Sequence, residues 1–397
     1  MGVGVAEDWP QWRGPDRTDV SIETGLLGAW PAEGPELVWT FKNAGIGFSG
    51  PAVVDGTLYI MGAREGVEQL LAIDAAEGRE LWSLDVGDVF EIDRGNGPRS
   101  TPTVAGGRVY ALGAKGNLVC ADASDGRLIW TVSMSDLGGT PPRWGYCESL
   151  LVDGERVICT PGGPKGAVAA LDAATGKVVW QAREFTNAAQ YASPIAIEWA
   201  GVRQYVQLTM ESLVGIRASD GKLLWESDWP GQTAVIPTPI YRDGHVYITS
   251  GYGIGSKLVR LGPDNSVSDV YFNKVMKNQH GGVILLGEHL YGYSDGRGWT
   301  AQDFKTGEAV WSDKEKLGKG SITYADGRFY CLSQDEGTVV LIDASPEGWH
   351  ERGRFQLPYD SKLRAPKWLI WTHPVISGGR LYLRNQDLLF SYDVKAD

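Results

Sequence analysis

Cationic, aromatic and titratable side chains at particular points of the sequence could together bind or transform a small molecule. Arg99, Arg143 and Lys319 would attract an anion such as a carboxylate or a phosphate, to which an arginine offers a bidentate pair of N–H donors. Aromatic rings would stack on a flat ligand, such as a sugar ring or a quinone. The aromatic and polar residues that we expect beside these cations are Phe48, Trp144, Tyr191, Trp371, Asn96 and Gln190.

Proton exchange would fall to His280, His373 and Glu148, because histidine titrates near neutral pH and a carboxylate can act as a base. Beside the cations, the pKa of Glu148 should fall, which would make it a poorer acid but an available base or ion-pair partner. No Ser-His-Asp order is evident. The Gly-rich stretch GYGIGSK at residues 251–257 joins two expected strands and opens no helix, so it does not match a phosphate-binding loop.

The elements that would position these residues come from an internal repeat that ends in tryptophan. Segments such as LVCADASDGRLIW and VAALDAATGKVVW contain a tight Asp-Gly or Thr-Gly turn, and such turns need the positive φ that glycine adopts freely. A degenerate copy, LVRLGPDNSVSDVYF, ends at Phe272. The complete copies end at Trp82, Trp130, Trp180, Trp225 and Trp311.

Each repeat reads as four short strands, and a unit of roughly 45 residues with four strands is a propeller blade. The inner strands begin near residues 49, 100, 148, 192, 237, 281, 320 and 372, which gives eight blades. The last unit lacks an outer strand, and the N-terminal ELVWTF can supply it, so that no blade keeps an open edge. We predict an all-β, eight-bladed β-propeller of four-stranded antiparallel blades over residues 37–397, with residues 1–36 as an extension packed on it.

Equivalent positions of the eight blades differ in character. The column that contains Thr101 holds glycine, serine or threonine, as expected where eight strands converge, with His373 as the exception. The column that contains Arg99 holds unlike residues, for which structural repetition gives no reason, so we predict a ligand site at this mouth of the central channel. Two plainer interpretations stay open: Arg99 could form an ion pair between blades, and His373 could be a core histidine bonded to a backbone carbonyl. In blade order this ring of unlike residues is Phe48, Arg99, Cys147, Tyr191, Ile236, His280, Lys319 and Trp371.

Composition narrows the function further. The 397 residues carry a formal net charge of −12 without a run of Lys or Arg, so no nucleic-acid partner is expected. No apolar stretch reaches the roughly 18 residues of a membrane span. The four cysteines form no Cys-x-x-Cys pair, so we expect no metal site and expect Cys120, Cys159 and Cys331 to be small buried residues. The start, MGVGVAEDWPQW, has neither the basic nor the apolar region of an export signal and is compatible with a mature N-terminus carrying an added Met.

The D-x-x-T-G-K-x-x-W pattern resembles the pyrroloquinoline-quinone (PQQ) repeat of the quinoprotein alcohol dehydrogenase-like propellers, from about residue 37 to the C-terminus. The segments DWPQWRGPDR, YGYSDGRGW and HPVISGGRLYLR are similar to those of a bacterial branch of that family. The resemblance implies a periplasmic or secreted protein, in which the tryptophan that ends each outer strand docks between blades. These structural tryptophans would be Trp39, Trp82, Trp130, Trp180, Trp225 and Trp311.

Three functions are compatible with this family. The first is binding of a small anionic or carbohydrate-like ligand in the central funnel, whether or not a reaction follows. The second is a scaffold for envelope proteins, similar in size to the BamB type. The third is a PQQ-dependent dehydrogenase, but dehydrogenases of the family carry adjacent cysteines and a calcium held by Glu, Asn and Asp side chains. This chain has no adjacent cysteines, so no cofactor is predicted, and PQQ with calcium stays an alternative.

Overall fold

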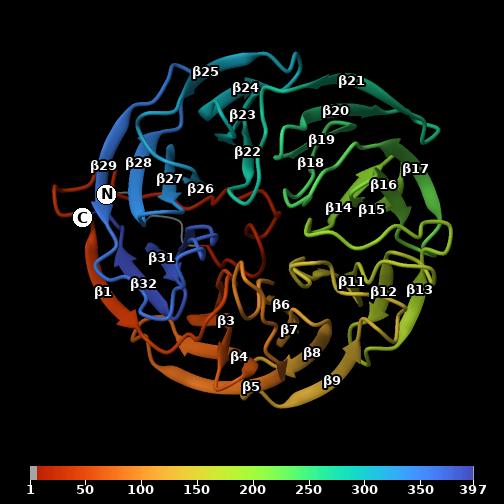
Figure 1. Cartoon of the computed structure of the whole chain (residues 1–397), viewed down its shortest axis with the longest axis horizontal. Helices are drawn as coiled ribbons and strands as arrows, with labels where there is room; N and C mark the ends of the chain where they lie inside the picture. Colours follow the sequence, from red (N-terminus) through yellow and green to blue (C-terminus); the bar gives the residue numbers. More distant parts are fainter. Residues whose placement is uncertain (1–6, 397) are drawn as a thin grey trace.

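The computed structural model describes residues 7–396, which form a closed ring of eight blades (Figure 1). Each blade is a four-stranded antiparallel sheet, and no helix occurs within residues 7–396. That part of the chain therefore holds no helix able to cross a membrane. The predicted all-β, eight-bladed propeller is confirmed, whereas the added Met lies outside the described residues.

The blades are numbered 1 to 8 along the chain, beginning with the blade that contains β2. The inner strands are β2 (Ala52–Val54), β6 (Thr103–Ala105), β10 (Leu151–Asp153), β14 (Ile195–Trp199), β18 (Ile240–Arg242), β22 (Val283–Leu286), β26 (Gly320–Ala325) and β30 (Val375–Ser377). The second strands are β3 (Thr57–Arg64), β7 (Arg108–Leu112), β11 (Arg156–Cys159), β15 (Val202–Leu208), β19 (His245–Ser250), β23 (His289–Ser294), β27 (Arg328–Ser333) and β31 (Arg380–Asn385). The third strands are β4 (Val67–Asp74), β8 (Asn117–Asp122), β12 (Ala169–Asp172), β16 (Ser212–Arg217), β20 (Gly255–Leu261), β24 (Gly298–Asp303), β28 (Thr338–Asp343) and β32 (Leu388–Asp393). The outer strands are β5 (Glu80–Asp88), β9 (Leu128–Ser133), β13 (Val178–Gln181), β17 (Leu223–Asp228), β21 (Val267–Asn273), β25 (Ala309–Asp313), β29 (Glu351–Gln356) and β1 (Glu36–Phe41).

Blade 8 combines the two ends of the chain. Strand β1 pairs antiparallel with β32, with Trp39 opposite Ser391, and completes the order β1-β32-β31-β30. The predicted closure by the N-terminal strand is therefore confirmed. The closure ties the start of the chain to its end and gives the last blade the outer strand that its own repeat lacks.

The tryptophans of the outer strands join each blade to the next. Trp130 of blade 2 donates from its indole Nε1 to the carbonyl of Ala173 in blade 3, at 3.0 Å. A side chain on Gly176 of the same turn would meet the Trp130 ring at 2.8 Å, and the φ of 71° there also favours glycine. The predicted structural role is thus confirmed, although Trp225 differs by donating to Gln204 of its own blade. The same contact to the next blade is made by Trp39, Trp82, Trp180 and Trp311.

The degenerate repeat of blade 5 has an aromatic residue at this place, but not Phe272. Tyr271 lies opposite Leu258 of β20 and donates to the carbonyl of Phe304 in blade 6, at 3.0 Å. Because side chains alternate along a strand, Phe272 points the other way and is 50% exposed. The alignment of Phe272 with the tryptophans is therefore wrong by one residue.

Residues 9–21 cross the centre of the ring, and we call this segment the N-terminal plug (Figure 1). Arg13, Arg17 and Asp19 have positive φ angles of 62°, 57° and 58°, a conformation that residues with a side chain rarely adopt without support. That support comes from the blades, because the plug has a hydrogen-bonding partner in or next to every inner strand. In blade order these partners are Val53, Val104, Leu150, Pro194, Thr238, Val283, Tyr324 and His373.

Candidate functional site

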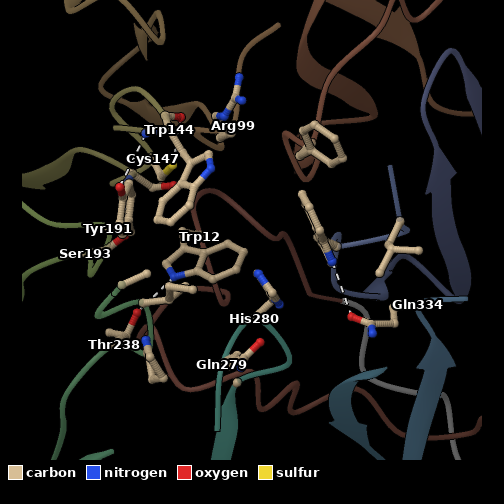
Figure 2. Close-up of a pocket in the computed structure, with 18 of the residues that line it drawn as sticks. Trp12, Arg99, Trp144, Cys147, Tyr191, Ser193, Thr238, Gln279, His280 and Gln334 are labelled. Atoms are coloured by element: carbon tan, nitrogen blue, oxygen red, sulfur yellow. Dashed lines mark hydrogen bonds between the residues drawn. The ribbon is translucent and has the colours of Figure 1, made fainter. Parts of the chain in front are cut away.

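A pocket of about 440 Å³ lies at the axis of the propeller (Figure 2). Trp12 and Arg13 of the plug form its floor, and the segments that lead into the inner strands form its walls. Equivalent positions of a closed ring lie at similar distances from its axis, so the ring of unlike residues converges there. Its members that line the pocket are Phe48, Arg99, Cys147, Tyr191, Ile236, His280 and Trp371.

Aromatic rings cover two sides of the pocket. His280 stacks on Trp371, with 4.7 Å between ring centroids and 10° between planes, and Phe48 lies 5.0 Å from Trp371. On another side, Trp144 packs against Tyr191 at 5.8 Å. These walls suit a flat ring that lies against them.

Arg99 is held by its own loop rather than by a neighbouring blade. Its guanidinium donates to the carbonyls of Gly95 and Gly97 and lies over the rings of Phe48 and Phe90, at 5.7 and 5.1 Å. No carboxylate among residues 7–396 forms an ion pair with Arg99, so the interpretation as an ion pair between blades is wrong. Burial lowers the pKa of Arg99, whereas nearby Cys147 and Glu68 raise it.

His280 is the predicted proton carrier that lines the pocket. Burial lowers its pKa to about 3, and the charges of Lys319 and His373 act in the same direction. The imidazole is therefore neutral at neutral pH. Its Nδ1 is buried and has no hydrogen-bonding partner among the described residues.

His373 lies in the core, 3% exposed, and does not line the pocket. Its Nε2 donates to the carbonyl of His280 at 2.7 Å, which confirms the interpretation as a core histidine bonded to a backbone carbonyl. Its Nδ1 lies 3.1 Å from Oδ2 of Asp19, the same oxygen that Arg13 contacts at 2.7 Å. Both ring nitrogens thus face oxygen atoms of the protein and are not directed into the pocket.

Glu148 is also buried, 1% exposed, and accepts a hydrogen bond from the backbone N–H of Thr160. Burial raises the pKa of Glu148 to about 7, although the bonds from Thr160 and the charge of Arg17 favour the ionised form. The predicted fall in this pKa is therefore wrong. Desolvation dominates because the carboxyl is held away from water, outside the lining of the pocket.

Four predicted ligand-binding residues have other partners and do not line the pocket. Lys319 donates to Asp295 at 2.7 Å and to Gln279 at 2.5 Å, so its charge is already paired. The guanidinium of Arg143 lies 5.0 Å from the ring of Trp144. Gln190 accepts from the backbone N–H of Val235, and Asn96 accepts from that of Ile92. Any role of these four residues in binding stays a prediction.

Several residues that line the pocket were not predicted. Trp12 and Arg13 lie in DWPQWRGPDR, which precedes the repeats, so alignment of the blades gives them no equivalent. Arg94 and Tyr252 come from loops between strands, and Gln279 precedes the ring position of blade 6. The unusual density of tryptophan and arginine in residues 9–17 is the signal that could have pointed to the plug.

The pocket is cationic although the protein is acidic. Its described lining holds three arginines but no carboxylate, in a chain with a net charge of −12. Asp19 pairs with Arg13, which leaves Arg94 and Arg99 without a carboxylate partner in residues 7–396. The pocket therefore favours an anionic ligand.

The residues present do not fit calcium-bound PQQ. Residues 7–396 contain no group of three His, Cys, Asp or Glu side chains that could hold a metal ion, and the pocket lacks the carboxylates that calcium prefers. The four cysteines are free, and Cys147 is the cysteine that lines the pocket. Burial raises the pKa of the Cys147 thiol to about 12, so it is not a thiolate at neutral pH.

The family model described as outer membrane protein assembly factor BamB matches residues 23–136 and 90–313. The chain belongs to this family. Its curated relatives include the dehydrogenase subunit of a quinone alcohol dehydrogenase from Gluconacetobacter polyoxogenes, 34% identical over 33% of this chain and 19% of the relative. BamB of Burkholderia pseudomallei is 28% identical over 40% of each chain. The matched segments thus span less than half the length of these two relatives.

Solved structures share the fold of this BamB-family chain. BamB of Moraxella catarrhalis has a TM-score of 0.63 at 16% identity, over 91% of this chain and 98% of the other. A quinohemoprotein alcohol dehydrogenase from Comamonas testosteroni has a TM-score of 0.64 at 14% identity, over 98% of this chain and 80% of the other. The chain is thus a PQQ-like propeller with relatives of both the BamB and the dehydrogenase type.

Proposed function

We propose that this protein binds a small anionic ligand with a flat or sugar-like ring in the axial pocket. The observation that carries the proposal is the lining of the pocket, which holds arginines and stacked aromatic rings but no carboxylate. An anion there would gain the charges of Arg94 and Arg99, and its ring would stack on Trp371 or Trp144. We further propose that the described part of residues 1–36 belongs functionally to the propeller, because Trp12 and Arg13 form the floor.

Matched pairs of ligands test this proposal. Binding would be measured by calorimetry for 2-naphthoate and its neutral amide, and for glucuronate and glucose. We expect the charged member of at least one pair to bind more tightly, and Arg94→Ala to reduce that preference with little change in stability, because Arg94 is exposed. Lys222→Ala, an exposed cation on a peripheral turn, is the matched control. Equal binding within both pairs, or no binding at all, would contradict the proposal.

The second candidate function is a scaffold for envelope proteins in the periplasm, which the match to the BamB family favours. The connection from β29 to β30 exposes Tyr359 and Leu363 to about half of their full extent. A partner that covers this loop would bury both side chains. If the scaffold is the main function, Tyr359→Ser with Leu363→Ser abolishes co-purification of outer-membrane assembly proteins from the source organism, while ligand binding is unchanged. Co-purification at the wild-type level would contradict this candidate.

A quinone dehydrogenase is the third candidate. Because quinone alcohol dehydrogenases are among the relatives of this chain, one direct measurement tests for that activity. PQQ would be added with and without calcium, and dye-linked oxidation of an alcohol would be followed. Because the lining lacks calcium ligands, we expect no calcium-dependent activity. Alcohol oxidation that requires both additions would overturn this expectation.

A further inference from the structure

Three neighbouring blades each place a hydroxyl group on the wall of the pocket. Ser149, Ser193 and Thr238 occupy equivalent positions in blades 3, 4 and 5, and all three line the cavity. We call these residues the hydroxyl arc. In Figure 2, Ser193 and Thr238 lie on one side of the pocket and Gln334 lies on the opposite side.

Each oxygen of the hydroxyl arc already accepts a hydrogen bond from the protein. Ser149 accepts from the backbone N–H of Thr101 at 2.9 Å, and Ser193 accepts from the backbone N–H of Ser149 at 2.9 Å. Thr238 accepts from the indole N–H of Trp12 at 3.0 Å. These bonds fix the positions of the oxygens at the wall.

Each hydroxyl of the arc is still free to donate its hydrogen. A hydroxyl has one donor and two acceptor sites, and none of the three donates to an acceptor within residues 7–396. What the arc offers to the pocket is therefore three O–H donors in a row. Donors that converge on one place suit the oxygens of a carboxylate or phosphate.

The rest of the same column offers no such donors. In blade 7, Ser321 donates its hydroxyl to the carbonyl of Thr372 at 2.8 Å and does not line the pocket. Blade 8 has His373, whose two ring nitrogens face Asp19 and the carbonyl of His280. Blades 1 and 6 have glycine, and the threonine of blade 2 does not line the cavity. Within residues 7–396, the donors of this column that line the pocket are thus confined to blades 3 to 5, because the unpaired hydroxyl of Thr101 lies outside the lining.

We propose that the hydroxyl arc is an oxyanion subsite, which takes the carboxylate or phosphate group of the ligand. The proposal rests on the function proposed above, and it adds the orientation of the ligand. With its anionic oxygens on the arc, the ring of the ligand extends toward the stacked pair His280 and Trp371 across the pocket. Arg99, in the neighbouring blade 2, also lines the pocket and adds positive charge to it.

The test uses 2-naphthoate and 2-naphthamide as probes and calorimetry of the full-length protein at neutral pH. Ser193→Ala removes a donor, whereas Ser193→Thr keeps one, and Thr238→Val and Thr238→Ser form a second pair. We expect each donor-deleting variant to weaken binding of naphthoate by roughly 10- to 100-fold, as for a hydrogen bond to a charged group, and to leave naphthamide little changed. The hydroxyl-keeping variants should retain most of the affinity. Ser321→Ala, from the same column but outside the pocket, is the matched control and should bind naphthoate like the unaltered protein.

The outcomes separate this proposal from the one on which it rests. If the unaltered protein prefers naphthoate but Thr238→Val binds it equally well, the arc is not the subsite, while an anion-binding pocket stands. The same conclusion follows if donor deletion weakens the binding of naphthoate and of naphthamide equally, since the arc then does not distinguish an anion from a neutral ligand. If the unaltered protein binds none of the four ligands named above, both proposals fail. Thr238→Val leaves the Ser193 hydroxyl in place, so it decides the question even if Ser193→Ala does not fold.

Discussion

At the outer edge of the propeller one contact recurs from blade to blade, whereas at the axis equivalent positions hold unlike side chains. The indole of Trp130 bonds to Ala173 and packs on Gly176. Four other outer strands repeat the hydrogen bond, and three of them, those of Trp39, Trp82 and Trp180, also repeat the packing on glycine. At the axis, Arg99, Tyr191 and His280 share one position of the repeat but have different partners. A residue type that repeats from blade to blade therefore marks the contacts that hold the blades together. A position at which the residue type varies marks a surface that can bind a ligand.

The largest expected effect is at the outer edge. Trp130→Ala removes a buried ring from the contact between blades 2 and 3 and should lower the free energy of unfolding by about 3–5 kcal/mol. Urea denaturation measures this loss. Below the unfolding transition, the affinity for 2-naphthoate should not change, because Trp130 lies outside the pocket. Loss of affinity for 2-naphthoate without loss of stability would contradict the assignment of structural residues to the outer edge and of binding residues to the axis.

The next effect concerns a buried group near the axis and depends on pH. Glu148 has a pKa of about 7 in the folded protein, against 4.5 for a glutamate in water, so folding favours its protonated form. Its contribution to stability is fully present below pH 4.5 and is lost as the pH rises through 7. Glu148→Gln cannot ionise, so its stability relative to the unaltered protein should rise by about 2–3 kcal/mol from pH 5 to pH 8. Urea denaturation at several pH values measures the difference, and a difference that does not vary with pH would show that Glu148 is ionised throughout.

At the axis itself, the expected effect is on binding rather than on folding. Trp371→Ala removes the ring that stacks on His280 and should weaken 2-naphthoate by roughly 10-fold, as expected for loss of an aromatic contact. Trp371→Phe keeps a stacking surface and should retain most of the affinity. Calorimetry measures both variants. A large loss of stability with unchanged affinity would place Trp371 with the structural tryptophans instead.

The smallest effects sharpen the comparison within one strand of blade 5. Phe272→Ser alters an exposed ring and should change the free energy of unfolding by less than about 0.5 kcal/mol. Tyr271→Phe removes the hydroxyl that bonds to Phe304 and should cost about 1 kcal/mol. Thermal unfolding compares the two variants. A larger loss of stability in Phe272→Ser than in Tyr271→Phe would show that Phe272, and not Tyr271, takes the place of the tryptophans.

The sequence allowed prediction of the fold because glycine turns and outer tryptophans recur together, and each depends on the other for its position. It also identified the ring at the pocket, since alignment of the blades shows where Arg99 and His280 break the repeat. The plug could not be predicted in this way, because Trp12 and Arg13 have no equivalent in any blade. Alignment also cannot distinguish Ser193 from Ser321, which share a column. Only the structure shows that Ser193 lines the cavity and that Ser321 donates to a carbonyl.

The N-terminal plug has a consequence for how the protein is made. Its residues are synthesised before the eight blades, yet Asp19 bonds to His373 in the eighth blade. Blades 1 to 7 can form one after another during translation, since each of these seven sheets pairs neighbouring segments of the chain. Arg13 and Arg17, with their left-handed backbone, find their carbonyl acceptors outside the plug in blades 3, 4 and 6, so these bonds are complete only after the sixth blade has formed. The centre of the propeller therefore matures only after the eighth blade has been synthesised, and until then the plug lacks part of its hydrogen bonds.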